Sequence, residues 1–215
     1  MKYFFLITIF LVLSNAAAAF ELKGKFNQGN FILGKAEPNS KVFIDKKEVK
    51  VSSEGFFAFG LAKDRKNDVN IEVLNNNSKK VLTKKVYKKK YKIQKIDGLP
   101  KKQVTPPKEV YERIKNDNKL IGEARSINSD LIYFSDKFKA PINNSIITGI
   151  YGSQRILNGI PKSPHYGLDF AAKEGTEIKA MLDGVVTLSE KDLYYTGGTV
   201  IFDHGHGVST LYMHM

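Results

Sequence analysis

"GGTVIFDHGHGVSTLYMHM", residues 197–215, is the stretch that decides the fold. Its two halves, Thr199–Asp203 and Val208–His214, are rich in β-branched and aromatic residues, and the glycine-containing "HGHG" separates them. This pattern predicts a β-hairpin. Two earlier segments with the same glycine-punctuated character, "SIITGIYGSQR" (145–155) and "GTEIKAMLDGVVTLSE" (175–190), predict further strands. We therefore expect residues 138–215 to form an antiparallel β-sheet domain.

The chain ahead of this domain divides into two parts by composition. From residue 20 to residue 92, short apolar alternations are broken at close intervals by turn residues such as "EPNS" and "NNNS". This pattern is typical of a small β-sandwich or barrel, and we assign the sandwich a binding or spacer role. Residues 93–137 begin with prolines and glycine and continue with apolar residues at helical spacing, which predicts a linker with one helix at about 107–126. The predicted fold class is mainly β, with this helical linker between the sandwich and the C-terminal sheet.

The first 19 residues have the character of a secretory signal peptide. Lys2 precedes an apolar run from Tyr3 to Leu13, and the small residues Ala16–Ala19 offer cleavage sites. No later stretch approaches the roughly 20 apolar residues that a membrane-spanning helix needs. The sequence therefore predicts an exported protein, located in the periplasm or cell envelope, whose mature form has no transmembrane segment.

The composition limits which residues can bind a metal or act as a nucleophile, and which partners the protein favours. The 215 residues contain no cysteine, so metal ligands must be His, Asp or Glu, and a cysteine nucleophile is excluded. The net charge is +12, and the segment Lys79–Lys102 carries eleven lysines and one acidic residue, Asp97. A basic block of this kind favours anionic envelope polymers as partners, and export argues against nucleic acid. The alternative is a solvated lysine-coated surface without a partner.

All histidines lie in the last third of the chain. In an extended segment, residues four apart face the same way, so His165 and Asp169 can converge on one ion, and both side chains suit zinc. The alternative is a plain hydrogen-bonded His–Asp pair. His214 is expected on the returning strand of the hairpin, pointing into a polar cleft or to solvent. His204 and His206 are expected in the turn and therefore outside a metal site.

Residues 151–215 also resemble a known family, the lysostaphin/LytM-type zinc metallopeptidases. The resemblance rests on an ordered set of motifs: H-x-x-x-D, then G-T, a single Ala, D-G-V-V, a glycine pair, D-H-G, and a Tyr two residues before a His. It implies an exported zinc metalloendopeptidase that cleaves peptide cross-links of bacterial peptidoglycan. It also implies that His165 and Asp169 are the first two zinc ligands and that His214 is catalytic.

The resemblance leaves one part of the site unaccounted for. In this family the third zinc ligand belongs to a later H-x-H motif, and the sequence reaches Met215 before such a motif. Catalytic zinc usually has three protein ligands. We therefore expect a partial peptidase domain that is truncated before its third ligand and, as given, inactive. The alternative to an enzyme is a catalytically inactive LytM-like module that binds cell wall or activates a partner amidase.

Overall fold

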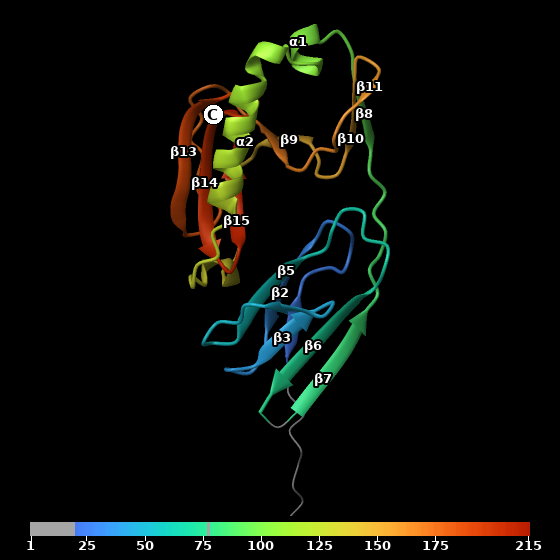
Figure 1. Ribbon diagram of the computed structural model, residues 1–215, viewed down its shortest axis with the longest axis vertical. Helices are drawn as coiled ribbons and strands as arrows, with labels where there is room; N and C mark the ends of the chain where they lie inside the picture. Colours follow the sequence, from blue (N-terminus) through green and yellow to red (C-terminus); the bar gives the residue numbers. More distant parts are fainter. Residues whose placement is uncertain (1–19, 77) are drawn as a thin grey trace, which may run out of the picture.

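The computed structural model describes residues 20–76 and 78–215, and it consists mainly of β-strands with one long helix (Figure 1). This confirms the predicted mainly β fold class. An N-terminal half, blue to green, lies below a C-terminal half in yellow to red, and a green segment connects them. The predicted signal peptide, residues 1–19, lies outside the described residues. Within the described part of the chain, no helix is both long and apolar enough to cross a membrane.

Two antiparallel sheets form the N-terminal half. One has the strand order β1-β2-β5 and the other has the order β4-β3-β6-β7. Every neighbouring pair in both sheets is antiparallel, and short hairpins join the pairs that are consecutive in the chain. The bounds are Glu21–Lys23 (β1), Phe31–Lys35 (β2), Lys41–Ile44 (β3), Lys47–Val49 (β4), Phe56–Gly60 (β5), Val69–Asn75 (β6) and Ser78–Lys84 (β7).

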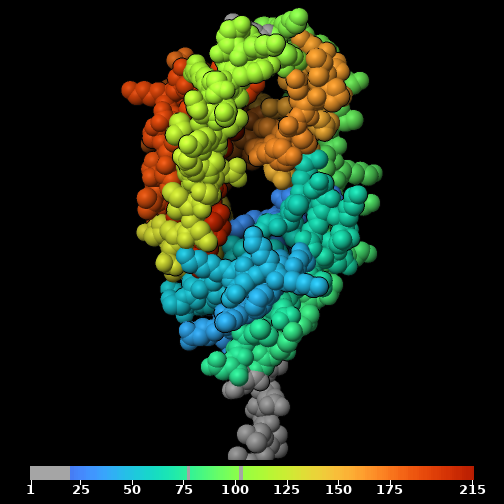
Figure 2. Space-filling model, viewed as in Figure 1, coloured from blue at the N-terminus to red at the C-terminus, as the bar shows by residue number. Residues whose placement is uncertain are grey.

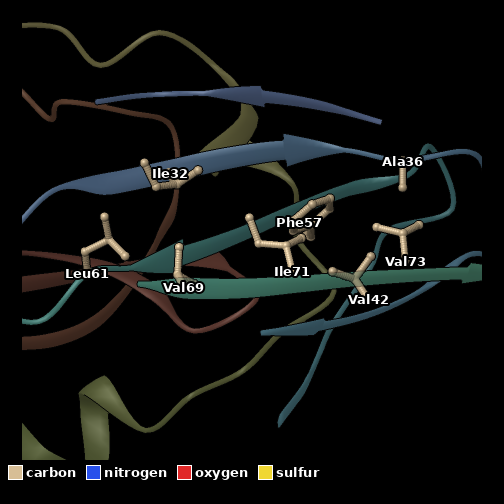
Figure 3. Close-up of a cluster of buried hydrophobic side chains, with 8 residues drawn as sticks. All are labelled: Ile32, Ala36, Val42, Phe57, Leu61, Val69, Ile71 and Val73. Carbon is tan, nitrogen blue, oxygen red and sulfur yellow. The ribbon is translucent and has the colours of Figure 1, made fainter. Parts of the chain in front are cut away.

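The core of this half lies between the two sheets (Figure 3). Along β6, Val69, Ile71 and Val73 are all buried, because alternate side chains of a strand point to the same face. Phe57 of β5 is fully buried, and its ring covers Gly34 of the paired strand β2, where a Cβ atom would overlap it. The short apolar alternations of the sequence thus build one shared core. Its buried members are Ile32, Ala36, Val42, Phe57, Leu61, Val69, Ile71 and Val73.

The lysine-rich segment Lys79–Lys102 begins on β7, an edge strand of its sheet. Its lysines up to position 101 are exposed. Several of their ammonium groups lie over aromatic rings, a favourable contact that still leaves the charge at the surface. These pairs are Lys80 with Phe20, Lys84 with Phe26, Lys85 with Tyr87, and Lys89 with Tyr91. Binding of anionic envelope polymers by this segment stays a prediction.

A strand also forms inside the segment for which the sequence predicts a linker. β8, Ile93–Ile96, pairs in parallel with β10, Gln154–Leu157, so that Gln94 lies beside Arg155. β11, Ile160–Pro161, pairs antiparallel with the other edge of β10. This three-stranded sheet therefore ties the segment after β7 to the C-terminal half.

The C-terminal half contains a three-stranded antiparallel sheet, β13-β14-β15, and a separate antiparallel pair, β12-β9. β14 and β15 form the predicted hairpin, with Asp203 opposite Ser209 in the register. The two strands of the β12-β9 pair place Asp169 opposite Gly149. The bounds are Ile146–Gly149 (β9), Asp169–Ala171 (β12), Val185–Leu193 (β13), Gly197–Gly205 (β14) and Val208–Tyr212 (β15).

The long helix α2, Tyr111–Arg125, packs against β13 and β14. It begins later than the sequence predicts, because residues Lys108–Val110 form a 3₁₀ turn directly ahead of it. A separate short helix, α1, spans Lys101–Val104. Arg113 fixes α2 to the sheet through an ion pair with Asp192 (Nη2 to Oδ2, 2.8 Å). The space-filling view shows the two halves in contact along both flanks, with openings left between α2 and the orange strands (Figure 2).

Candidate metal centre

His165 lies in the loop between β11 and β12, and main-chain hydrogen bonds hold it on both sides. Its N–H donates to Ser153 O (2.8 Å), and its C=O accepts from Gly152 N–H (2.7 Å). Gly152 has a φ of 88°, and a Cβ atom there would overlap the ring of Tyr91, so the position requires glycine. His165 is only 8% exposed. The local sequence therefore holds the imidazole in a buried, defined place.

Asp169 begins β12 and lies directly beside His165. Its Oδ1 is 3.0 Å from Nε2 of His165, and its Oδ2 is 3.2 Å from Nη2 of Arg155. Gly149 lies opposite Asp169 in the register, and a Cβ atom at Gly149 would overlap the carboxylate. The structure thus brings together the two residues for which the sequence predicts a ligand role.

His214 lies beyond the end of β15, and the prediction that places it on the returning strand is wrong. β15 ends at Tyr212, His214 has a φ of 62°, and its N–H donates to Thr196 O (2.8 Å). The chain can leave the ladder here because Gly198 has no side chain, and Met215 lies over its backbone where a Cβ atom would be. The exposed side chain of His214 therefore lies on an irregular segment after the strand.

One cleft of about 730 Å³ is lined by both Asp169 and His214. Much of its remaining lining is apolar and includes Leu168, Ile178 and Leu211. An apolar cleft with a few polar groups is the usual form of a ligand-binding or substrate-binding site. Asp169, which contacts the buried His165, therefore borders the same cleft as His214.

His204 has a structural role and lies on β14, although the sequence predicts it in the turn. It is fully buried. Its Nδ1 donates to Asp183 O (2.7 Å), since a carbonyl can only accept, and its Nε2 then accepts from Thr210 Oγ1 (2.8 Å). His165 differs, because its buried Nδ1 has no hydrogen-bond partner among the described residues. Structural hydrogen bonds thus occupy His204 fully and His165 only in part.

His206 occupies the hairpin turn, as predicted, and joins the two halves of the molecule. Its N–H donates to Ser129 O (3.1 Å), and its Nδ1 donates to Lys50 O in the N-terminal half (3.2 Å). Its ring centroid is 4.9 Å from that of the buried Phe134. Lys50 also pairs with Asp130 (Nζ to Oδ1, 2.7 Å). His206 therefore lies at the interface between the N-terminal and C-terminal halves and contacts residues of both.

This interface should make stability depend on pH. Burial lowers the pKa of His206 below its usual 6.5, and the charge of Lys50 adds to this effect. Below about pH 6.5 the unfolded chain therefore binds more protons than the folded protein does. We expect full stability above this pH and a falling melting temperature as pH drops towards the folded-state pKa. Between pH 7.5 and 5.5, the melting temperature should fall more steeply with decreasing pH for the natural protein than for His206→Gln. Equal slopes would contradict the role assigned to His206.

Arg155 and Gly149 complete the surroundings of Asp169, and the sequence gives no signal for either. Both lie well before Asp169 in the chain and reach it only through strand pairing and packing. In the part of the chain that the structure describes, no group of three or more His, Asp or Glu side chains could hold a metal ion. His165 and Asp169 lie in contact, and their role as metal ligands stays a prediction.

Comparison with known proteins finds similarity in this region to one peptidase family. Residues 163–215 match Peptidase family M23. The curated relatives include the DD-carboxypeptidase/endopeptidase Mpg of Neisseria meningitidis serogroup B and of Neisseria gonorrhoeae. Each is 43% identical to this chain over 51 residues, which are 24% of this chain and 12% of the relative. The match thus spans a small part of the length of these relatives.

The fold also has a counterpart among solved structures. The crystal structure of a candidate peptidase M23 from Pseudomonas aeruginosa superposes with a TM-score of 0.59 at 24% sequence identity, covering 89% of this chain and 74% of that chain. At this identity the likeness shows the shared fold alone. The sequence match over residues 163–215 and the identity to Mpg support LytM-type peptidase family M23 for the C-terminal part of this chain.

Proposed function

We propose that this chain belongs to an exported zinc metalloendopeptidase that cleaves peptide cross-links of bacterial peptidoglycan. His165 and Asp169 are the proposed zinc ligands, and His214 is the proposed catalytic residue. One observation carries the proposal: His165 Nε2 and Asp169 Oδ1 lie 3.0 Å apart, and Asp169 shares a cleft with His214. The similarity to Mpg, whose name describes a DD-carboxypeptidase/endopeptidase, supports the substrate class.

The donor pair fits zinc in chemistry and in spacing. Imidazole nitrogen and carboxylate oxygen both bind zinc at about 2.0–2.2 Å, so two donors of a tetrahedral site lie about 3.3 Å apart. The observed 3.0 Å between His165 Nε2 and Asp169 Oδ1 is close to this value. A catalytic zinc usually takes three protein ligands and keeps one open position. The proposal therefore requires one ligand in addition to these two.

The roles of the side chains follow from their places. In peptidases of this kind, a bound zinc ion acts as a Lewis acid, which polarises the scissile carbonyl and lowers the pKa of bound water to about 7. His165 and Asp169 would hold the ion, and Asp169 lines the cleft. His214 is exposed at the same cleft, so its imidazole can orient the attacking water or donate a hydrogen bond to the developing oxyanion. The apolar lining, including Leu168 and Leu211, packs against the peptide and excludes other water.

The proposed substrate also supports the proposed location. Peptidoglycan lies outside the cytoplasmic membrane, so an enzyme that cleaves it must be exported. The predicted leader at residues 1–19 would provide export. A high positive charge, +12 over the whole chain, would favour association with an anionic envelope.

Digestion of purified peptidoglycan by the natural full-length protein tests the proposal. We expect new free amino groups, because hydrolysis of a peptide bond releases one amine for each bond cleaved. A chelator such as 1,10-phenanthroline should stop their release, and added zinc should restore it. Binding to the wall without any release of amines, with or without zinc, would favour the catalytically inactive module instead.

A further inference from the structure

Arg155 is a charged residue that contacts the His165–Asp169 pair from a different sheet. Its Nη2 is 3.2 Å from Oδ2 of Asp169. Its main chain is held on one side by the parallel register with Gln94 of β8, and on the other its C=O accepts a hydrogen bond from Lys162 N–H (2.9 Å). The guanidinium therefore approaches Asp169 from a strand whose position is fixed on both edges.

The two oxygens of the Asp169 carboxylate have different partners. Oδ1 faces His165 Nε2 at 3.0 Å, and Oδ2 faces Arg155 at 3.2 Å. Gly149 leaves room for the carboxylate, because a Cβ atom at that position would overlap it. These two contacts, with the space left at Gly149, together define the rotation of the carboxylate. Without Arg155, Oδ2 would lose its charged partner and the group could turn.

A carboxylate ligand with one oxygen held by a second residue is pre-organised for metal binding. Ligands of metal sites are usually oriented by such partners, and their loss typically weakens metal binding about 10–100-fold. Here Arg155 holds Oδ2, so Oδ1 stays beside the imidazole as the oxygen available to bind a metal ion.

We propose that Arg155 is a positioning residue of the metal site. It acts through Asp169, holding Oδ2 so that Oδ1 stays beside His165 Nε2 for a divalent cation, above all zinc. This inference rests on the proposed function, because it requires His165 and Asp169 to be ligands.

The positive charge of Arg155 acts against its positioning effect, because it repels a cation. The Arg155 and Asp169 side chains are 32% and 39% exposed, so solvent screens this repulsion. The hydrogen bond to Oδ2 is a direct contact and is screened less. Positioning should therefore dominate, and removal of Arg155 should weaken zinc binding.

The test measures zinc affinity in the natural full-length protein, by competition with a chromophoric chelator, for Arg155→Met and Arg155→Lys. We expect about 10–100-fold weaker binding for Arg155→Met. Arg155→Lys should fall between this variant and the natural protein, since an ammonium can donate to Oδ2 but lacks the planar fork. The absorption spectrum of the cobalt-substituted protein should change with Arg155→Met, because the ligand carboxylate is no longer held.

Arg113→Met is the control, since it removes a different Arg–Asp pair, the more exposed one that joins α2 to β13. It should bind zinc as the natural protein does, and melting temperatures without metal should show that both Met variants are folded. Unchanged or tighter binding by Arg155→Met, with Asp169→Ala defective, would overturn the positioning role alone. Undiminished zinc binding by both His165→Ala and Asp169→Ala would overturn the proposed site and this inference with it.

Discussion

Alanine in place of His165 or Asp169 is expected to remove bound zinc and, with it, hydrolysis of peptidoglycan. Each change deletes one of the two donors that lie 3.0 Å apart, and an ion left with fewer ligands is held weakly. His214→Ala should behave differently. It should keep its zinc but lose about 10²–10⁴-fold in rate, the usual contribution of a residue that transfers or positions a proton. Metal content and amine release, measured on the same preparations, separate the two classes.

His206→Gln provides the control for these variants. It removes a histidine from the same half of the molecule, but the ring it replaces contacts Lys50 and Phe134 at the joint between the halves. Its zinc content and activity should equal those of the natural protein. Full activity of Asp169→Ala would contradict the ligand assignment, and loss of zinc from His214→Ala would contradict the division between ligands and catalytic residue.

Phe57→Ala is expected to cause the largest loss of stability in the N-terminal half. The ring is fully buried, belongs to the core between the two sheets, and fills the space over Gly34. Removing a buried phenylalanine ring typically costs about 3–5 kcal/mol, because the lost burial adds to the energy of the cavity. The chain contains no tryptophan, so urea unfolding is best followed by far-UV circular dichroism.

Phe57→Leu is the matched variant, because it keeps most of the apolar volume and should lose much less stability. Zinc affinity should be unchanged in both variants, since His165 and Asp169 belong to the C-terminal half. A loss below about 1 kcal/mol for Phe57→Ala would contradict the close packing assigned to this core.

The sequence predicts those parts of the fold and site that depend on local pattern. The hairpin of β14 and β15 follows from β-branched residues on either side of "HGHG". The sequence predicts that His165 and Asp169 converge, and the structure places them in contact, although His165 lies in the loop before β12 and not in an extended strand. In both cases the residues that interact lie close together in the chain.

The remaining features depend on contacts between distant segments. β8 forms because β10 pairs with it, and nothing within Ile93–Ile96 identifies that partner. His214 leaves the strand because Gly198, on another strand, lets the chain lie over its backbone. Arg155 reaches Asp169 from a different sheet. The residue pattern within one segment does not show which distant segment will contact it.

The most direct test of the metal site is to locate zinc itself. Crystals of the natural full-length protein grown with zinc, with data collected on both sides of the zinc absorption edge, would give an anomalous difference map. We predict a peak within about 2.0–2.2 Å of both His165 Nε2 and an oxygen of Asp169, in the cleft shared with His214. A peak at His204 or His206, or no peak at His165 and Asp169 in zinc-loaded crystals, would contradict the account.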